Sequence, residues 1–452
     1  MARLFGTDGV RGVANAELTA KLAFDLGYSG ARVLAKISNK KTSILIGRDT
    51  RISCDMLEAA IVAGICSAGA EAVTVGVVPT PAIAYLTARY KADAGVVISA
   101  SHNSFEFNGI KFFDNRGYKL PDAIEDEIEV MIKSGEYALP TGAGVGRLVE
   151  NPAAREDYAG HLLSVAKCDL GGIKIALDCA NGAAYQIAPE LFRKLGAEVY
   201  AFHCEPDGVN INAGCGSTHI AALRAHVMDC GADIGFAFDG DADRMIAVDE
   251  LGNVIDGDIT LALLALDMKK RGALPNNTVV STVMSNIGLE LAVKSHGIKL
   301  VRTAVGDRYV LEEMLKNGYR LGGENSGHII CLDANTTGDG IFAALQLLIT
   351  LYADAPREGR AAVSELTGIV KAVPQIIRNA RVANERKETY LDDPVIRERC
   401  SMIEVKFNGE GRVLIRPSGT EPLIRVMIES NDRDLIEAEA DGLARLIEER
   451  LA

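Results

Sequence analysis

Hydrophobic positions repeat one pattern three times along the chain: an apolar, β-rich run, a helical segment, a second run, a second helix and a third run. The runs cover residues 43–51, 71–81 and 94–103, then 173–182, 197–208 and 232–244, then 277–286, 297–308 and 319–328. Strands that alternate with helices form mainly parallel sheets with helices on both faces. We therefore predict an α/β fold with three similar domains built on mainly parallel, mixed sheets; one large doubly wound sheet is the alternative.

The helix before the second run ends in a similar phrase in every copy: SAGAEAV, KLGAEVY or SHGIKLV. Glycine supplies the left-handed backbone that closes a helix, and an apolar strand then resumes. The phrases therefore predict the same helix-to-strand turn three times.

The pattern changes from about residue 370. A strand and a helix are followed by MIEVKF, an NGEG turn, RVLIRPSGTEPLIRVMIES and a helix from about Asp432 to the end. One face of this last helix is apolar, through Leu435, Ile436, Leu443, Leu446 and Ile447. This order predicts a C-terminal α+β domain. The full prediction is four domains, at residues 1–155, 156–253, 254–368 and 369–452, arranged around a central cleft.

Composition agrees with a large globular protein. A chain of 452 residues, with 48% hydrophobic and 24% charged residues, has room for several cores. The 48 Lys and Arg residues against 61 Asp and Glu give a net charge of −13 without a basic block. This charge disfavours binding to nucleic acid or to a membrane surface.

The chain also lacks the patterns of a membrane span and of a signal peptide. Its nine cysteines form no Cys-x-x-Cys pair, which favours reduced packing thiols over disulfides or a zinc knuckle. We therefore expect a cytoplasmic protein.

Four polar loops carry the candidate chemistry. Ligands of open α/β sheets bind beyond the carboxyl ends of the strands, where the third strand of each copy leads into a polar loop. These loops are SASHNSFEFNGIK (99–111), DGDADR (239–244) and GENSGH (323–328), and RPSGTEP (416–422) is the matching loop of the last domain. Three domains around one cleft would bring these loops together.

The DGDADR loop predicts a metal site. Asp239, Asp241 and Asp243 alternate with small residues, so an extended loop can direct three carboxylates at one divalent cation. Oxygen ligands favour Mg²⁺. A calcium-binding helix–loop–helix is an alternative because Glu250 is the twelfth residue from Asp239, but Arg244 occupies the position that needs glycine. A solvated acidic turn is a further alternative.

The loop at 99–111 offers Ser101, His102 and Lys111. A serine hydroxyl beside a cation and a base can carry a covalent group, and a phosphate on Ser101 would suit the metal. A turn stabilised by its own backbone hydrogen bonds is the structural alternative.

The two remaining loops predict sugar-phosphate binding. In RPSGTEP, Arg416, Ser418, Gly419 and Thr420 can surround one phosphate, although a plain hairpin turn is the alternative. In GENSGH, the carboxylate of Glu324, the hydroxyl of Ser326 and the imidazole of His328 can bind sugar hydroxyls and exchange protons.

These motifs, in this order, resemble those of the α-D-phosphohexomutase superfamily over nearly the whole chain. The resemblance also covers FGTDGVRG (5–12), GRDTR (47–51) and LDANTTGDG (332–340). It implies a phosphorylated Ser101, with one Mg²⁺ bound by Ser101, Asp239, Asp241 and Asp243. One departure is Ser104, where many members of the superfamily have proline after SHN, and loss of a fixed φ predicts a looser turn.

The resemblance implies roles for further residues. Glu324, Asn325 and Ser326 would bind the sugar, and the RPSGTEP loop would bind the phosphate that does not react. The catalytic candidates are Ser101, His102, Lys111, Arg11, Arg244 and His328.

The implied activity is the interconversion of glucosamine 6-phosphate and glucosamine 1-phosphate, with glucosamine 1,6-bisphosphate as intermediate or primer, for the synthesis of amino-sugar nucleotides. The resemblance further implies a homodimer formed through the first domain. Two alternatives stay open from the residues alone: an enzyme that prefers glucose or mannose phosphates, and a sugar-phosphate sensor without catalysis.

Overall fold

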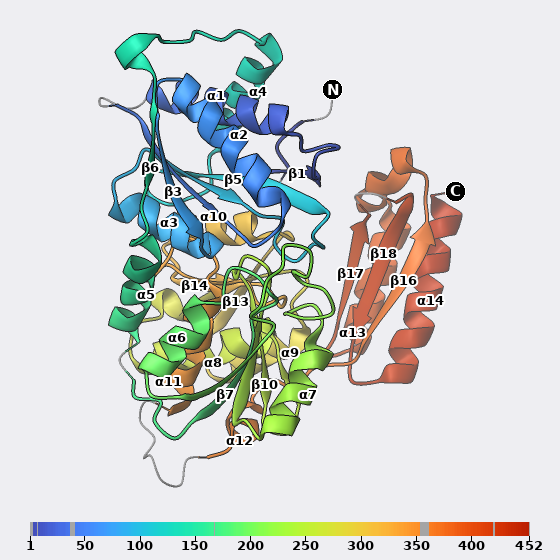
Figure 1. Cartoon of the computed structure of the whole chain (residues 1–452). Helices are drawn as coiled ribbons and strands as arrows, with labels where there is room; N and C mark the ends of the chain where they lie inside the picture. The colour runs from blue at the N-terminus through green and yellow to red at the C-terminus, as the bar shows by residue number, and fades with distance from the viewer. Residues whose placement is uncertain are drawn as a thin grey trace.

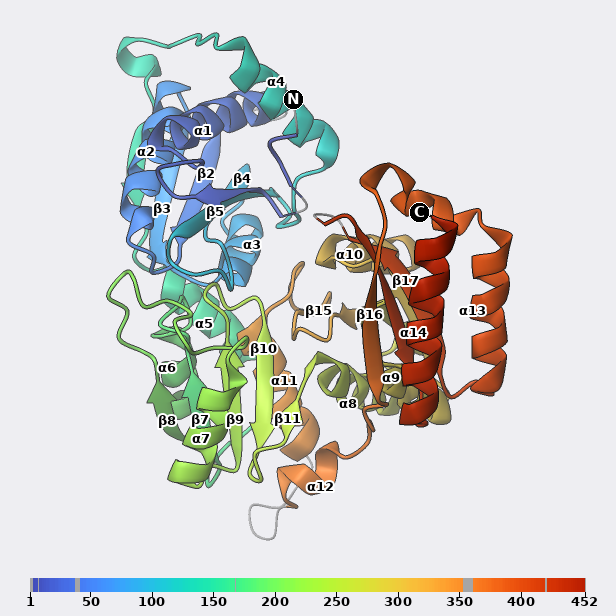
Figure 2. The same cartoon turned by 90° about the vertical axis from the view of Figure 1, so that its right-hand side faces the viewer.

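The computed structural model describes residues 3–6, 8–36, 41–166, 168–352, 361–418 and 421–451. Four sheets divide the chain in sequence order, with six, five, four and three strands. The first domain lies above the second in Figure 1, and the third connects them to the fourth, which stands to one side in both views (Figures 1 and 2). The prediction of three α/β domains and a C-terminal α+β domain is confirmed, and a single large sheet is excluded.

The bounds of the elements follow the predicted repeat closely. The first domain has β1 (Val10–Val13), α1 (Ala20–Ala35), β2 (Ser43–Arg48), α2 (Ser53–Ser67), β3 (Glu71–Val77), α3 (Thr80–Arg89), β4 (Ala94–Ile98), β5 (Phe107–Asp114), α4 (Asp122–Ser134) and β6 (Arg147–Glu150). The second has α5 (Ala154–Val165), β7 (Lys174–Asp178), α6 (Ile187–Lys194), β8 (Glu198–Phe202), α7 (Ile220–Cys230), β9 (Ile234–Phe238), β10 (Met245–Asp249) and β11 (Val254–Ile255).

The third and fourth domains continue the chain. The third has α8 (Gly257–Lys270), β12 (Thr278–Thr282), α9 (Ile287–Ser295), β13 (Lys299–Thr303), α10 (Asp307–Asn317), β14 (Leu321–Gly323), β15 (Ile329–Cys331), α11 (Gly340–Tyr352) and α12 (Val363–Thr367). The fourth has β16 (Gln375–Arg381), α13 (Pro394–Lys406), β17 (Arg412–Pro417), β18 (Leu423–Glu429) and α14 (Arg433–Arg450).

The first three sheets share one topology. In each, the first strand of the predicted repeat lies between the third and the second, all parallel, and an antiparallel strand follows the third: β4, β9 or β14 turns back into β5, β10 or β15. The third strands β4 and β9 are buried at every residue, which is why they appear as apolar runs. The predicted loops are therefore equivalent hairpin connections at the carboxyl ends of equivalent strands.

The glycine phrases have the predicted geometry. Gly69, Gly196 and Gly297 have φ angles of +88°, +94° and +65°, and each lies between a helix and the second parallel strand of its sheet. A left-handed backbone at these positions suits glycine because it carries no Cβ. The predicted helix-to-strand turn is thus confirmed in all three copies of the repeat.

The fourth domain differs from the prediction at one segment. MIEVKF was expected after the helix, but Met402–Lys406 form the end of helix α13 itself. Apolar residues at Ile396 and Ile403 pack into the core at helical spacing, and this burial decides the conformation. The other elements form a three-stranded antiparallel sheet in the order β16-β18-β17.

The hydrophobic cores divide the molecule unequally. One cluster contains residues of all of the first three domains, such as Leu45, Phe192 and Leu289, whereas the fourth domain has a cluster of its own. The predicted limit at 155/156 falls inside α5, and that at 253/254 lies between β10 and β11, which pair in one sheet. The exact domain limits therefore stay a prediction. Among the described residues, no helix is long and apolar enough for a membrane span, and all nine cysteines are free thiols.

Candidate active site

Three of the four predicted loops meet. Ser101 in the β4–β5 loop donates a hydrogen bond from Oγ to Oδ2 of Asp239 in the β9–β10 loop, at 2.6 Å. His328, at the end of the β14–β15 loop, places Nδ1 3.7 Å from Oδ2 of Asp243. Residues more than 130 positions apart in the chain thus form one buried centre.

The backbone of Ser101 is held in an unusual conformation. Its φ angle is 52°, in the left-handed region that residues with a Cβ rarely adopt. The fully buried guanidinium of Arg51 donates to the carbonyl oxygens of Ser101 at 2.9 Å, Asn103 at 2.8 Å and Phe107 at 3.1 Å. It also donates to the carbonyl oxygen of Ser104. A side chain that sequence reasoning left without a role therefore fixes the turn that lacks proline.

A second side chain holds the same turn from the second domain. Asn212 donates from Nδ2 to the carbonyl oxygens of Ser101 and Asn103, at 2.9 Å each. Asn212 lies outside every predicted motif, so no sequence signal identified it. The serine loop is thus held by two domains.

The three aspartates form the cluster that their spacing predicts. Asp239, Asp241 and Asp243 are almost fully buried, and one oxygen of each lies within 4.8 Å of the others. Oδ1 of Asp241 and Oδ1 of Asp243 are buried without a hydrogen-bond partner. Burial, together with Asp243 and Asp241, raises the pKa of Asp239 well above its usual range. Unsatisfied oxygens and repelling carboxylates fit a divalent cation, which would remove both costs.

Calcium binding by a helix–loop–helix is excluded as the basis of this site. Strands β9 and β10 flank the loop, and Glu250 lies beyond β10, where Oε2 accepts a hydrogen bond from the backbone of Ser364 at 3.2 Å. The twelfth residue is therefore turned to another part of the molecule.

Lys111 supplies positive charge inside the cluster. Its Nζ lies 2.9 Å from Oδ2 of Asp241 and 3.1 Å from Oδ2 of Asp8, and the side chain is 2% exposed. Burial lowers the pKa of Lys111, but the carboxylates, chiefly Asp241 and Asp8, outweigh it and raise the pKa. Lys111 therefore stays charged at neutral pH.

Arg244 and His102 lie beside Ser101. Nδ1 of His102 lies 3.2 Å from Nη1 of Arg244 and 3.4 Å from Oγ of Ser101. Burial and the charge of Arg244 lower the pKa of His102, so its imidazole is neutral at pH 7. Arg11 lies on β1 and pairs with Asp8. The structure thus brings the predicted catalytic candidates together.

A half-buried chain of charged side chains extends from this centre into the third domain. Nζ of Lys119 lies 2.6 Å from Oδ1 of Asp8 and 2.6 Å from Oδ2 of Asp307, and Asp307 lies 3.5 Å from Nε2 of His328. Sequence reasoning missed Asp8, Lys119 and Asp307. Asp8 stands in FGTDGVRG, but Lys119 and Asp307 lie outside the four predicted loops.

The surroundings of His328 shift the pKa of its imidazole in opposite directions. The amide of Gly338 donates to Nε2 at 3.1 Å, which favours the neutral ring. Burial also lowers the pKa, but Asp243 and then Asp307 outweigh it and raise the pKa of His328 to about 8. The imidazole can therefore gain or lose a proton near neutral pH.

The GENSGH loop presents polar groups next to this centre. Oε2 of Glu324 accepts a hydrogen bond from Ser326 at 3.3 Å, and Oε1 accepts one from the amide of Gly306 at 3.2 Å. Asn325 is exposed, and Glu324 and Ser326 are half-buried. All three can reach a ligand from solvent.

The RPSGTEP loop is tied within its own domain. Oγ of Ser418 accepts a hydrogen bond from the amide of Glu421 at 3.2 Å, and buried Lys387 donates to the carbonyl oxygens of Ser418 and Glu421. Lys387 was not predicted. Gly419 and Thr420 lie outside the described residues. Toward the residues that the structure describes, the guanidinium of Arg416 makes neither a hydrogen bond nor an ion pair.

Contacts between the fourth domain and the others lie at its base. The buried carboxylate of Glu429 accepts hydrogen bonds from Nδ2 of Asn286 at 3.0 Å and from the amide of Ile287 at 3.1 Å, and Arg412 donates to the carbonyl oxygen of Ser285 at 2.7 Å. Within the described part of the chain, no hydrogen bond or ion pair joins Arg416 or Ser418 to the other three loops. The predicted meeting of loops is therefore seen for three of them.

The class of protein follows from the domains and their loops. Four family models match in order: phosphoglucomutase/phosphomannomutase alpha/beta/alpha domain I at residues 2–138, domain II at 156–252, domain III at 256–370 and the C-terminal domain at 378–446. The chain belongs to the phosphoglucomutase/phosphomannomutase family, within the α-D-phosphohexomutase superfamily.

Individual members of that family are similar to the chain over its full length. The chain is 58% identical to the phosphoglucosamine mutase of Acetivibrio thermocellus and 57% identical to that of Clostridium acetobutylicum. Both alignments cover 100% of this chain and 100% of the relative. The similarity thus extends over every domain.

Solved structures share the fold at lower identity. A phosphoglucomutase/phosphomannomutase family protein from Burkholderia thailandensis has a TM-score of 0.83 at 23% identity, covering 99% of this chain and 98% of its own. The N-acetylphosphoglucosamine mutase of Aspergillus fumigatus, solved with GlcNAc-6P and magnesium, has a TM-score of 0.64 at 15% identity, covering 99% and 96%. Both comparisons support the four-domain arrangement.

Proposed function

We propose that the chain is a phosphoglucosamine mutase, which interconverts glucosamine 6-phosphate and glucosamine 1-phosphate and so supplies the precursor of UDP-N-acetylglucosamine for the cell wall. The observation that carries this proposal is the contact of Ser101 with Asp239 inside a triple-carboxylate cluster that also holds Lys111. Full-length relatives at 54% to 58% identity carry the same activity in their names, which favours the amino sugar over glucose or mannose phosphates.

Phosphoryl transfer would start from phosphorylated Ser101. An oxygen of a sugar hydroxyl attacks phosphorus, the bond between phosphorus and Oγ of Ser101 breaks, and the sugar becomes a 1,6-bisphosphate. The bisphosphate turns over and returns its other phosphate to Oγ. Lys111 and Arg244 neutralise charge on the transferring group, which is where most of the catalytic effect in phosphoryl transfer arises. Arg11, Lys111 and His328 are our candidates for proton transfer or for stabilising charge, and of the three His328 is the one that can exchange a proton near neutral pH.

A divalent metal fits the three aspartates, and we propose one Mg²⁺ bound by Asp239, Asp241, Asp243 and an oxygen of Ser101 or its phosphate. When bound, this ion neutralises the phosphoryl group and holds it in place. The buried, unpartnered oxygens of Asp241 and Asp243 support this assignment. Removal of metal with a chelator should abolish activity, and added Mg²⁺ should restore it.

Turnover of the bisphosphate needs a second phosphate environment. We assign it to Arg416, Ser418, Gly419 and Thr420, with Glu324, Asn325 and Ser326 holding sugar groups between the two ends. Among the described residues no partner occupies the guanidinium of Arg416, which supports a bidentate contact with phosphate.

We also propose a cytoplasmic homodimer. Strand β6 is exposed at all four residues, including Leu148 at 51% and Val149 at 39%, and it is an edge strand of the first sheet. Leu139 nearby in the chain is 58% exposed. An exposed apolar edge favours pairing with a second chain. Light scattering should give twice the chain mass, and Leu148→Lys should shift it toward the monomer.

Parallel assays with the 6-phosphates of glucosamine, glucose and mannose, with Mg²⁺ and with or without a bisphosphate primer, test the function. Glucosamine 6-phosphate should have the highest kcat/KM, and intact mass should show one phosphate, lost in Ser101→Ala. Binding of sugar phosphate without turnover by a phosphorylated, metal-loaded protein would instead establish a sensor.

A further inference from the structure

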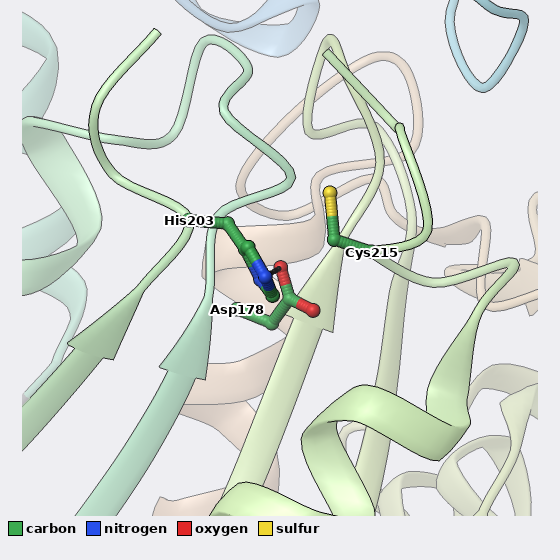
Figure 3. A group of neighbouring side chains, drawn as sticks. All are labelled: Asp178, His203 and Cys215. Atoms are coloured by element: carbon green, nitrogen blue, oxygen red, sulfur yellow. Dashed lines mark ion pairs between the residues drawn. The ribbon is translucent and has the colours of Figure 1, made fainter. Parts of the chain in front are cut away.

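A second group of metal-binding side chains lies in the second domain, away from the three aspartates. Asp178 is the last residue of β7, His203 follows β8, and Cys215 lies in the loop before α7. One oxygen, one nitrogen and the sulfur of these side chains lie within 4.8 Å of one another. Figure 3 shows the imidazole against the carboxylate, with Cys215 on the neighbouring segment.

The carboxylate of Asp178 is fixed by the backbone. It is fully buried, Oδ1 accepts a hydrogen bond from the amide of Ala180, and Oδ2 accepts one from the amide of Gly216, at 2.9 Å each. A carboxylate has about four acceptor sites, so lone pairs remain for a cation. The two amides thus orient the carboxylate of Asp178 and leave it able to bind a metal ion.

The imidazole of His203 is held next to this carboxylate at a conformational cost. Nδ1 is buried and lies 3.0 Å from Oδ1 of Asp178, and no second partner for it is found among the residues that the structure describes. The φ angle of His203 is 50°, which a side chain with a Cβ rarely adopts. The His203 side chain as a whole is 31% exposed, whereas Nδ1, the Asp178 carboxylate and Cys215 are buried.

We propose that Asp178, His203 and Cys215 bind one Zn²⁺ ion. A thiolate, an imidazole and a carboxylate are ligands that Zn²⁺ accepts together, whereas Mg²⁺ prefers oxygen alone. Three protein ligands leave a fourth position for one water molecule. On binding, the Cys215 thiol loses its proton to solvent and its sulfur bonds to the metal.

This ion would stabilise the loop that supports the reactive serine. Residues 204–214 run between two of the ligands, and Asn212 on this loop donates to the carbonyl oxygens of Ser101 and Asn103. The carbonyl oxygen of Gly208 accepts a hydrogen bond from the amide of Ile52, next to Arg51. The zinc ion would therefore fix both ends of the loop that hydrogen-bonds to the turn at Ser101. Binding of the ion itself does not depend on the proposed mutase activity.

Titration of the full-length, Mg²⁺-saturated, reduced protein with Co²⁺ as a spectroscopic substitute for Zn²⁺ tests the site. We expect one equivalent of Co²⁺ to give a thiolate-to-metal charge-transfer band. Added Zn²⁺ should then displace the bound Co²⁺ and remove the band. Co²⁺ at the three aspartates cannot produce this band, because that site has only oxygen ligands. Cys215→Ser should abolish the band, and Cys230→Ser, which removes a half-buried thiol from the same domain, should leave it unchanged.

His203→Asn provides a second variant that does not rely on replacing a buried residue. Asparagine tolerates a positive φ, so this variant should fold, and its metal affinity should fall by at least about tenfold. The proposal is wrong if the parent protein gives no charge-transfer band, or if the band and the affinity are unchanged in both Cys215→Ser and His203→Asn.

Discussion

The two ends of the proposed sugar-phosphate site are built differently. At the reactive end, Ser101, Lys111 and the three aspartates are almost fully buried and are tied together across domain boundaries. At the other end, Arg416 belongs to a domain with a hydrophobic core of its own. The hydrogen bonds of that domain to the rest of the chain include those of Val373, Arg412 and Glu429, at its base.

The difference separates two tasks. Charges that stabilise phosphoryl transfer act most strongly when they are fixed in advance and shielded from water. A group that binds the phosphate which does not react can instead arrive with its domain, so that substrate enters before the site closes. Removal of a group at the reactive end should therefore affect kcat, and removal at the other end should affect KM.

Loss of the proposed nucleophile, Ser101, is the strongest test of this separation. Ser101→Ala should lower kcat by at least about a thousandfold, because no other group takes the phosphate. Ser101→Gly should behave alike and fits the positive φ at this position. Circular dichroism should show folded protein, and appreciable turnover in both variants would contradict the mechanism.

Two buried lysines offer a matched pair. Lys111→Met should lower kcat by about 10²–10³ because it removes a fixed charge beside the transferring group. The partners of Lys387 in the described part of the chain are carbonyl oxygens of the RPSGTEP loop, so Lys387→Met should raise KM with a small change in kcat. Steady-state kinetics on both variants provide the test. A raised KM in Lys111→Met together with a lowered kcat in Lys387→Met would contradict the separation of the two ends.

Arg416→Ala should raise KM for glucosamine 6-phosphate by roughly tenfold to a hundredfold, since a charge-assisted bidentate contact with phosphate is lost. The value of kcat should change little. Arg433, exposed at the start of α14, provides the control: Arg433→Ala should keep the parent KM. An unchanged KM in Arg416→Ala would remove the phosphate role of this loop.

The smallest effect concerns the joint between the third and fourth domains. Oδ2 of Asp258 accepts a hydrogen bond from the amide of Asn286, whose side chain contacts Glu429, and burial raises the pKa of Asp258 to about 6 from 3.8. The folded protein holds this proton more tightly than the unfolded chain, so ionisation of Asp258 lowers stability as pH rises from about 4 through 6.

Asp258→Asn should remove that loss and stabilise the protein at pH 7.5 by on the order of 1 kcal/mol. At pH 3, where the carboxyl is mostly protonated in both states, the gain should disappear. Thermal unfolding at both pH values measures the difference, and an equal shift at both would point to a cause other than ionisation.

Sequence patterns predicted most of this arrangement. The three repeats and their loops were identified because buried strands leave long apolar runs and equivalent strands end at equivalent places. The segment 402–407 was assigned wrongly to a place beyond the helix, since apolar residues over so short a stretch fit a strand or a helix equally well.

Other features have no local signal. The chain from Asp8 through Lys119 to Asp307 joins charges that are distant in sequence, and each residue alone resembles an ordinary surface charge. Asn212 and Lys387 act on main-chain carbonyl oxygens, so nothing in the sequence of the loops they hold points to them. Contacts of this kind become visible only when the folded chain brings the partners together.

The Arg51 clamp has a consequence for how the serine loop can vary. Its guanidinium recognises four peptide oxygens and no side chain of the loop. Substitutions at Ser104 or Phe107 therefore leave the clamp intact as long as the peptide path is kept. Arg51 would therefore bind the peptide oxygens equally well with proline or with serine at position 104. The side chains of this stretch can thus change while the backbone at Ser101 keeps its position.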